Sequence, residues 1–527
     1  MQLKRYFTRY RNNLHSLIKR SKFNYYKDKI QEAGGDSRKF WTVVNEMAGR
    51  PTGKDPFPVE AFSGVDGTVT SDEVKVVSNS INEYFASVGS RLAESIAPAG
   101  PPQVRDVDHP VNSVFTLRPV TREEIFEIVH KMKGGSAPGW DGIPSEIYKK
   151  NIDVLIQPIH YIINLSISCG EFPDLFKIAK VIPIFKSGSK SEIINYRPIS
   201  LLATFSKILE KCIKIQLTNY LESEKILTES QYGFRQHLNT SNALFDITKI
   251  ISQTIGNKKR VLLTFLDLAK AFDSVNRKKL IAKLKSIGLN NISLQWFASY
   301  FENRTQMVTI NGVLSEKVPV DYGVVQGSTL GPLLFLIYIN NITKMSLKGF
   351  LLLFADDTVL VSTGCTWDEA YNQASSDLAK IKNWFDHNTL TVNIGKTKHL
   401  PIYIRADMDP GPRVLRMHSC GDPSSATCGC GIVERVEQYK YLGITIDHKL
   451  NWVPHVQSVK RRLRKMIYAF MQLSRVLTMD QLRTVYFAYV QSVLQYGVLA
   501  WGGASAAVLE PLAVTQRSII KIILKNQ

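Results

Sequence analysis

The chain has 527 residues, 44% of them hydrophobic, which is enough apolar material for a folded protein larger than one compact core. Lys and Arg outnumber Asp and Glu by 66 to 46, and the net charge of +20 disfavours an acidic small-molecule ligand and favours a polyanionic partner such as nucleic acid. The six sparse, irregularly spaced cysteines argue against a secreted disulfide framework and for a reducing compartment.

The amino-terminal segment is strongly basic. Its first thirty residues carry nine Lys or Arg against one acid, and apolar residues recur at helical spacing at Leu3, Phe7, Tyr10, Leu14 and Leu17. Such a helix either contacts nucleic acid or exposes a solvated face over a small apolar stripe. The charge of the whole chain favours nucleic-acid contact.

No segment has the pattern of a signal peptide or a membrane span. Basic residues interrupt any apolar stretch near Met1. The most apolar window near the end, residues 493–509, is too polar and too short to cross a bilayer. We therefore expect a soluble, intracellular protein with no membrane partner.

A segment rich in Pro, Gly, Ser and Val follows the basic region. It covers about residues 50–119 and includes a helix-like stretch at 71–90. We interpret the segment as a loosely packed linker without chemistry. Patterned helices and strands resume near Val120, where the main folded body is expected to begin.

Asp267 and the pair Asp356-Asp357 each follow an apolar, strand-like run, at 261–266 and 351–354. A second apolar run follows the pair, which predicts a β-hairpin with two carboxylates at its tip. An Asp-Asp pair in a hairpin is usually only a polar turn. Acids at the ends of buried strands, however, lose hydration and repel one another unless cations neutralise them.

Mg²⁺ is the cation that such oxygen ligands suit best. We predict that Asp267, Asp356 and Asp357 hold two Mg²⁺ ions, with Mn²⁺ as a substitute. Because side chains alternate along a strand, Asp356 is expected to bridge with Asp267, and Asp357 to lie more peripherally.

Longer segments around these acids closely resemble the motifs of reverse transcriptases, and those of non-LTR (LINE-type), jockey-like retrotransposons in particular. The three central segments, in their usual order, are FLDLAKAFDSV (265–275), YGVVQGSTLGPLLFLIYIN (322–340) and FADD (354–357). Others resemble the amino-terminal, fingers and later palm motifs of the family: GGSAPGWDGIPSEIYKK (134–150), VIPIFKSGSKSEIINYRPISLL (181–202), LTVNIGKTK (390–398) and YKYLGITID (439–447). The resemblance covers nearly the whole chain.

The resemblance implies an RNA-directed DNA polymerase that copies retrotransposon RNA by two-metal nucleotidyl transfer from a primer 3′-hydroxyl. Its partners would be an RNA template, a DNA primer, the RNA–DNA hybrid and deoxynucleoside triphosphates, in the nucleus and cytoplasm. The implied fold is an α+β right-hand polymerase with fingers, a palm built on an antiparallel sheet, and a helical thumb. A catalytically silent or domesticated RNA-binding remnant of the same fold is the alternative.

The expected division of the chain combines these observations. It comprises a basic helical connector (1–49), a linker-like segment (50–119), an amino-terminal extension of the polymerase (120–165), fingers and palm (166–447) and a helical thumb (448–527). About 120 residues precede the first motif, which is too few for the apurinic-type endonuclease of complete elements. We therefore expect a fragment or truncated copy.

By resemblance, six residues contact the incoming nucleotide: Lys186, Arg197, Phe272, Gln326, Gly327 and Lys396. Lys186 and Arg197 lie on the two arms of a predicted hairpin that turns near Gly188, where they can bind phosphate. Lys396 would lie near departing pyrophosphate, although Lys398 is a close competitor.

Three residues of the polymerase motifs have both a functional and an ordinary interpretation. Phe272 matches the aromatic gate beneath the sugar, or is a core phenylalanine. Gln326 and Gly327 match the loop beside the nascent base pair, or are part of a Gly-rich loop. We interpret Asp273 as a helix cap and not as a metal ligand.

Two further segments are expected to bind the primer and the duplex. Tyr441, Leu442 and Gly443 lie in a segment that resembles the primer grip. Downstream, an apolar stripe predicts a thumb helix. Its other faces carry Lys460, Arg461, Arg462, Arg464 and Lys465, either as duplex contacts or as a solvated surface.

A Cys-containing segment lies between two of these motifs. Cys420, Cys428 and Cys430 can be combined with His418 as a zinc cluster, but C-x-C lacks the familiar two-residue loop and no second pair follows. We therefore interpret the segment as a Cys- and Gly-containing turn between strands.

Overall fold

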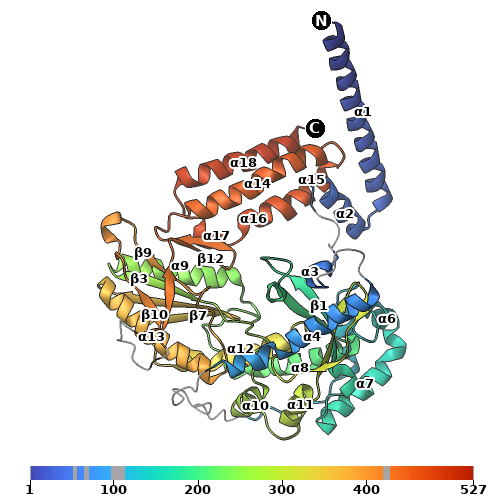
Figure 1. Cartoon of the computed structure of the whole chain (residues 1–527). Helices are drawn as coiled ribbons and strands as arrows, with labels where there is room; N and C mark the ends of the chain where they lie inside the picture. Colours follow the sequence, from blue (N-terminus) through green and yellow to red (C-terminus); the bar gives the residue numbers. More distant parts are fainter. Residues whose placement is uncertain are drawn as a thin grey trace.

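The computed structural model describes residues 2–50, 56–63, 70–96, 113–418, 420 and 428–525. Two sheets form the centre of the described chain, with helices packed around them (Figure 1). The carboxyl-terminal helices lie above the sheets, and the long first helix extends away from the body. The mixed α+β class expected from the sequence is confirmed.

The larger sheet carries all three acidic positions. It has six strands in the order β10-β11-β9-β3-β8-β7. Their bounds are β3 (Arg260–Leu266), β7 (Phe350–Phe354), β8 (Asp357–Gly364), β9 (Lys398–Ile402), β10 (Leu415–Met417) and β11 (Gly431–Arg435). Every neighbouring pair is antiparallel except β11 with β9, which run parallel.

Helices cover both faces of this sheet because the central strand β3 is apolar on both sides. Leu262 and Leu266 belong to the core shared with α13 (Trp367–His387), whereas Leu263 and Phe265 belong to the core shared with α9 (Thr240–Gly256). Alternate side chains of a strand point to opposite faces, so α13 and α9 lie on opposite sides of the sheet. Because helices pack on both faces of β3, the end of the strand next to Asp267 is held in place.

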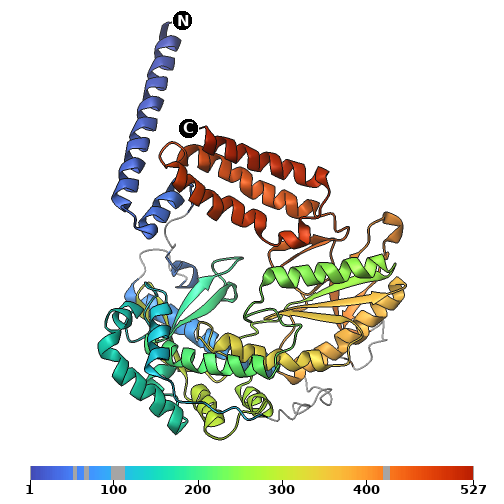
Figure 2. The same ribbon diagram turned by 180° about the vertical axis from the view of Figure 1, so that it is seen from behind.

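The second sheet has five strands, in the order β2-β1-β4-β5 with β6 beside β4. Figure 2 shows it beside the larger sheet, below the carboxyl-terminal helices. The bounds are β1 (Ile178–Phe185), β2 (Tyr196–Leu201), β4 (Thr305–Ile310), β5 (Val313–Leu314) and β6 (Val318–Pro319).

Helix α4 (Ser71–Glu94) packs on this sheet. It begins at a capping box of Thr70 and Glu73, which explains the sharp start of the helix. Its buried Ile81 and Phe85 belong to one core with strand residues of the sheet. The expected helix at 71–90 is confirmed, but the expectation of loose packing is wrong for α4, because its apolar stripe is buried. Residues 51–55, 64–69 and 97–112 of that segment lie outside the described residues.

The basic amino-terminal segment forms α1 (Gln2–Ala33) and α2 (Ser37–Met47). The side chains of residues 3–25 of α1 are all exposed, including the apolar Leu3, Phe7 and Tyr10. Lys29 pairs with Glu46 of α2 at 3.0 Å, and α2 packs against the carboxyl-terminal helices. The expected basic helix is therefore confirmed, and it is anchored near its carboxyl-terminal end.

The carboxyl-terminal helices follow the short hairpin of β12 (Gln438–Tyr441) and β13 (Ile444–Asp447). They are α14 (Val453–Leu473), α15 (Met479–Tyr486), the π-helix Phe487–Gln491, α16 (Ser492–Gln495), α17 (Val498–Trp501) and α18 (Ala506–Leu524). Val456, Leu463 and Phe470 of α14 are buried, as their spacing predicts. These helices share one core with the α9 face of the larger sheet.

The remaining helices pack below and beside the sheets. They are α3 (Glu60–Ser63), α5 (Arg122–Lys131), α6 (Ser145–Lys150), α7 (Ile152–Cys169), α8 (Thr204–Ser223), α10 (Arg277–Ser286), α11 (Asn291–Phe301) and α12 (Gly331–Ile339). Among the described residues, α7 is long and apolar enough, by length and composition, to cross a membrane. Its Ile159 and Ile163 are buried and it packs against α5 and α11, as a core helix would.

Candidate active site

Two elements of the larger sheet bring the acids to one end of it. Asp267 follows β3 directly. β7 and β8 form a hairpin in which Phe354 pairs with Asp357, so Ala355 and Asp356 make the two-residue turn. The expected hairpin is confirmed. Ala355 has φ +57°, in the left-handed region that two-residue hairpin turns require.

Gln231 supports this turn, and the sequence analysis missed it. It is buried, and its Oε1 accepts hydrogen bonds from the backbone N–H of Ala355 at 2.9 Å and of Gly233 at 2.8 Å. A Cβ on Gly233 would lie 2.4 Å from the Ala355 nitrogen, so only glycine permits this approach. The signal that could have found Gln231 is its position beside Gly233 in a polar turn that precedes a helix.

One pocket gathers every residue that the sequence assigned to catalysis or to nucleotide binding. Its lining includes Asp267, Asp356, Asp357, Lys186, Arg197, Phe272, Gln326, Gly327 and Lys396. The pocket lies between the two sheets, because its walls come from both. Among the other lining residues, Asn195, Phe234, Lys270 and Asn393 are polar or aromatic side chains that were not predicted as site residues.

The three carboxyl groups destabilise one another's charge. Burial raises the pKa of Asp267 and of Asp356, and the charge of Asp267 raises that of Asp356 further. Asp357 is exposed as a residue, yet lost hydration around its carboxyl, together with Asp356 and Asp267, raises its pKa to about 6. Such a group of acids binds divalent cations favourably, because a cation removes the repulsion. The donor set therefore fits Mg²⁺, which prefers carboxylate oxygens.

Cations line the opposite wall of the pocket. Lys186 and Arg197 lie on the arms of the predicted hairpin, where Ile184 pairs with Arg197 and the Lys186 N–H donates to the Asn195 carbonyl. Burial lowers the pKa of Lys186, and the positive charges of Arg197 and Lys396 lower it further. Crowded positive charges of this kind are favourable once an anion is bound between them.

Lys270 adds another cation to the pocket. Its Nζ donates to the Tyr196 carbonyl at 3.0 Å, which ties the turn after β3 to β2. Burial lowers the pKa of Lys270, and the charges of Lys186 and Arg197 lower it further. The residue lies three positions after Asp267, and that short spacing is the signal from which it could have been found.

The structure also separates the two candidate lysines of the 390–398 segment. Lys398 pairs with Glu434 at 2.6 Å and donates to the Gly395 carbonyl. Lys396 lines the pocket and lowers the pKa of Asp267. This placement agrees with the choice of Lys396 over Lys398 as the residue near departing pyrophosphate.

Phe272 lies both at the pocket and against the core, the two placements between which the sequence did not decide. Its ring lines the pocket and stacks on the buried Phe335, with ring centroids 4.6 Å apart and an interplanar angle of 15°. Phe234 makes an edge-on contact with it, with ring centroids 6.3 Å apart. The ring is therefore a pocket wall that the core holds in one orientation.

The loop with Gln326 and Gly327 packs against β2. Ser200 donates its N–H to the Gln326 carbonyl at 2.8 Å. Gly327 has φ +112°, and a Cβ there would lie 2.4 Å from the Ser200 carbonyl oxygen. Glycine is thus required for loop packing as well as for any approach to a ligand.

Asp273 has a different role from the one expected. The cap of α10 is Asn276, whose side chain accepts the Lys279 N–H. Asp273 instead accepts a hydrogen bond from Gln326 Nε2 at 2.9 Å, and burial raises its pKa to about 6. The helix-cap interpretation is therefore wrong, because Asp273 lies within the preceding turn and fixes Gln326.

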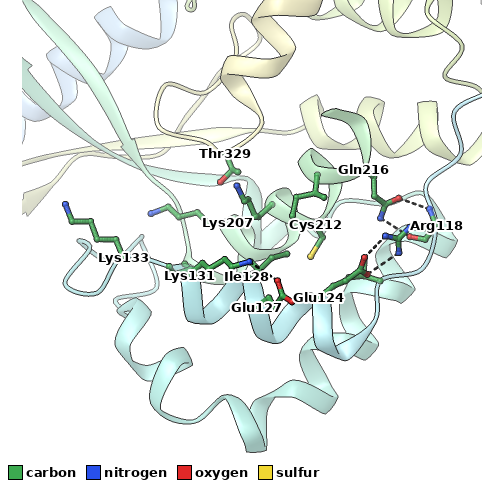
Figure 3. A pocket seen from close by; sticks show the side chains of 14 residues that line it. Arg118, Glu124, Glu127, Ile128, Lys131, Lys133, Lys207, Cys212, Gln216 and Thr329 are labelled. Atoms are coloured by element: carbon green, nitrogen blue, oxygen red, sulfur yellow. Dashed lines mark hydrogen bonds and ion pairs between the residues drawn. The ribbon is translucent and has the colours of Figure 1, made fainter. Parts of the chain in front are cut away.

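A basic cavity adjoins the same loop at Thr329 (Figure 3). Thr329 lines it together with the lysines Lys131, Lys133, Lys207 and Lys211. The buried Glu210 holds the loop between the two cavities, since its Oε2 accepts the N–H groups of Thr329 at 2.7 Å and Leu330 at 3.0 Å. No local pattern marks Glu210 in the sequence, because its role depends on a contact 119 residues away.

The β12–β13 hairpin carries the residues expected to grip the primer. Leu442 and Gly443 form its turn, with φ of +44° and +83°. The Leu442 carbonyl accepts a hydrogen bond from the Tyr496 hydroxyl at 2.6 Å. Tyr441 is buried against Phe265, so its side chain does not form an exposed nucleic-acid contact, contrary to expectation.

The ring of Tyr439, in the same hairpin, stacks on the ring of Phe265, with centroids 4.1 Å apart. Phe265 lies two residues before Asp267 in β3. This contact aligns the hairpin with the acidic end of β3.

On α14, four of the five expected cations are exposed and Lys460 is partly buried; the exposed ones are Arg461, Arg462, Arg464 and Lys465.

The part of the chain that forms the pocket matches a known protein family. Residues 186–446 match the model of the reverse transcriptase (RNA-dependent DNA polymerase) family. This range contains all three acids and the cationic wall of the pocket. The chain thus contains a domain of the reverse transcriptase (RNA-dependent DNA polymerase) family.

Its distant homologues are polymerases of jockey-like, non-LTR retrotransposons. The RNA-directed DNA polymerase from the mobile element jockey of Drosophila melanogaster is 25% identical over 98% of this chain and 56% of its own length. The probable RNA-directed DNA polymerase from transposon BS of Drosophila melanogaster is 27% identical over 79% of this chain and 46% of its own length. The probable RNA-directed DNA polymerase from transposon X-element of the same organism is also 27% identical, over 84% of this chain and 48% of its own length. The chain therefore spans about half the length of the curated relatives it matches.

Proposed function

We propose that this chain synthesises DNA on an RNA template, using a primer 3′-hydroxyl and deoxynucleoside triphosphates. The observation that carries the proposal is the pocket in which Asp267, Asp356 and Asp357 face the cations Lys186, Arg197, Lys270 and Lys396. Acids that hold metal ions, beside cations that hold phosphates, are the combination that phosphoryl transfer requires.

Each wall of the pocket has a separate task in this reaction. The three aspartates would hold two Mg²⁺ ions, which stabilise charge on the attacking and leaving oxygens. Arg197 and Lys186 bind the triphosphate, and Lys396 neutralises the departing pyrophosphate. Phe272 lies beneath the sugar, and Gln326 contacts the nascent base pair. The five-stranded sheet would then be the fingers, the six-stranded sheet the palm, and α14–α18 the thumb.

The template and the primer would approach from different elements. The lysines around Thr329 form a positive surface that suits the phosphates of the RNA template. The turn of Leu442 and Gly443 positions the primer end, because Tyr439 ties its hairpin to the strand of Asp267.

Primer extension with the purified chain tests this proposal. A labelled DNA primer annealed to RNA, with deoxynucleotides and Mg²⁺, should be extended to the end of the template. Binding of the primed template without any extension would reject DNA synthesis. That result would favour the alternative of an RNA-binding remnant.

Duplex binding should depend on the cations of α14. Replacing Lys460, Arg461, Arg462, Arg464 and Lys465 by alanine removes phosphate contacts and the counterions that they release. The slope of log affinity against log salt should then become shallower by about 0.9 for each lost contact. Fluorescence anisotropy of a labelled duplex across a salt series measures that slope.

The matched control replaces Lys278 and Lys285 by alanine. Both are exposed on α10, which lies at the opposite end of the molecule from α14 (Figure 1). The control should leave the slope unchanged. If the α14 variant also leaves it unchanged, these residues face solvent only and the proposed duplex contact is wrong.

A further inference from the structure

A cluster of three cysteines and one histidine lies at the end of the β10–β11 hairpin. Met417 pairs with Gly431 at the end of β10 and β11, and His418 and Cys430 are the residues just beyond each strand. The ligand atoms of His418, Cys420, Cys428 and Cys430 all lie within 4.8 Å of one another. Most of the turn predicted between these strands lies outside the described residues, but the described part brings four potential metal ligands together.

Two distances within the cluster are close to those of a tetrahedral zinc site. His418 Nδ1 lies 3.3 Å from the Cys428 sulfur and 3.7 Å from the Cys420 sulfur. With Zn–S bonds of about 2.3 Å and a Zn–N bond of about 2.0 to 2.1 Å, a tetrahedron separates sulfur from nitrogen by about 3.6 Å. The spacing H-x-C-x₇-C-x-C differs from common zinc motifs, but the hairpin brings its two halves together.

We propose that these four residues bind one structural Zn²⁺ ion. Three thiolates and one imidazole form a closed donor set that leaves no position for water, as structural zinc sites do. Sulfur ligands select zinc over Mg²⁺, whereas the aspartates of the active site have the opposite preference. The chain would therefore hold two chemically separate metal sites.

The surroundings of the cluster suit the charge of such a site. Zn²⁺ with three thiolates and a neutral imidazole carries one net negative charge. The Arg416 guanidinium donates to the Cys430 carbonyl at 3.0 Å, which places a positive charge beside it. His418 is buried, so its imidazole orientation is restricted before metal binds.

The zinc site would also support the loop that carries Lys396. A Cβ on Gly431, next to Cys430, would lie 2.5 Å from Ile394 Cδ1, so the hairpin packs closely on this loop. Asn393, the preceding residue, donates its N–H to the Asp267 carbonyl at 2.8 Å. The loop is thus held between the cluster and the active-site strand, and zinc would position it without contacting substrate.

Metal analysis of the purified full chain, produced with zinc in the medium, tests the proposal without any measurement of DNA synthesis. The wild type should contain about one zinc ion per chain after dialysis against Mg²⁺ buffer. Cys428→Ser should lose this zinc. The matched control Cys365→Ser, at an exposed cysteine after β8, should retain it. Failure of DNA synthesis would leave these expectations unchanged.

Two further measurements on the wild type remain informative if Cys428→Ser does not fold. Protein produced with Co²⁺ should show thiolate-to-cobalt charge-transfer absorption, and zinc removal by a chelator should speed amide hydrogen exchange at residues 393–397. A wild type without bound zinc and without the cobalt absorption would overturn the proposal. So would a folded Cys428→Ser chain that keeps its zinc.

Discussion

Asp356→Asn should reduce the rate of DNA synthesis by roughly 100-fold or more, which is about 2.7 kcal/mol at 1.36 kcal/mol per decade. The amide is nearly the same size as the carboxyl, so the turn and its Gln231 hydrogen bond to Ala355 should persist. What is lost is one negative charge among three acids that share a pocket. Single-turnover extension of a primed RNA template measures the effect.

The control for this variant is Asp368→Asn. Asp368 pairs with Arg413 on the surface, where its side chain is 75% exposed, and it does not line the pocket. Its replacement should leave the rate within about twofold, because exposed ion pairs contribute little. Equal rates for wild type and Asp356→Asn would remove Asp356 from the metal site.

Phe272→Val should allow the enzyme to incorporate ribonucleotides. An apolar pocket alone rejects an added hydroxyl by only about 10²-fold, so strong discrimination needs a rigid group in that space. The stack on Phe335 supplies this rigidity, since it holds the Phe272 ring in one orientation. The ratio of kcat/KM for a deoxynucleotide to that for the matching ribonucleotide should fall by about 100-fold, with a smaller change for the deoxynucleotide alone.

Phe126→Val is the control for the loss of an aromatic ring. Phe126 is 40% exposed on α5 and does not line the pocket, so the selectivity ratio should stay as in the wild type. A Phe272→Val variant in which both rates fall together, with an unchanged ratio, would show that Phe272 acts only in core packing.

The sequence predicted the local elements of the site well because each has a short-range signal. An apolar run that ends at Asp267 predicts a buried strand, and two such runs around Asp356 and Asp357 predict a hairpin. The same holds for the arms that carry Lys186 and Arg197. The arrangement of these pieces in one pocket was expected only from the resemblance to reverse transcriptases.

Features that depend on distant contacts were missed or misassigned. Gln231 and Glu210 act on loops more than 100 residues away, and no periodicity reveals such pairs. Tyr441 was assigned to the nucleic acid, but it packs on Phe265 of another strand. The segment of Cys420 and Cys428 was interpreted as a simple turn, because its ligand spacing is unusual until β10 and β11 pair.

Mn²⁺ binding tests the central claim, that the three aspartates form the metal site of a polymerase. The sample is the zinc-loaded chain with primed RNA template and a non-hydrolysable deoxynucleotide, and bound Mn²⁺ is counted by electron paramagnetic resonance. The wild type should bind about two Mn²⁺ ions. Asp356→Asn should bind fewer, or bind them much more weakly, while Asp368→Asn should match the wild type. Equal Mn²⁺ binding by wild type and Asp356→Asn would contradict the account.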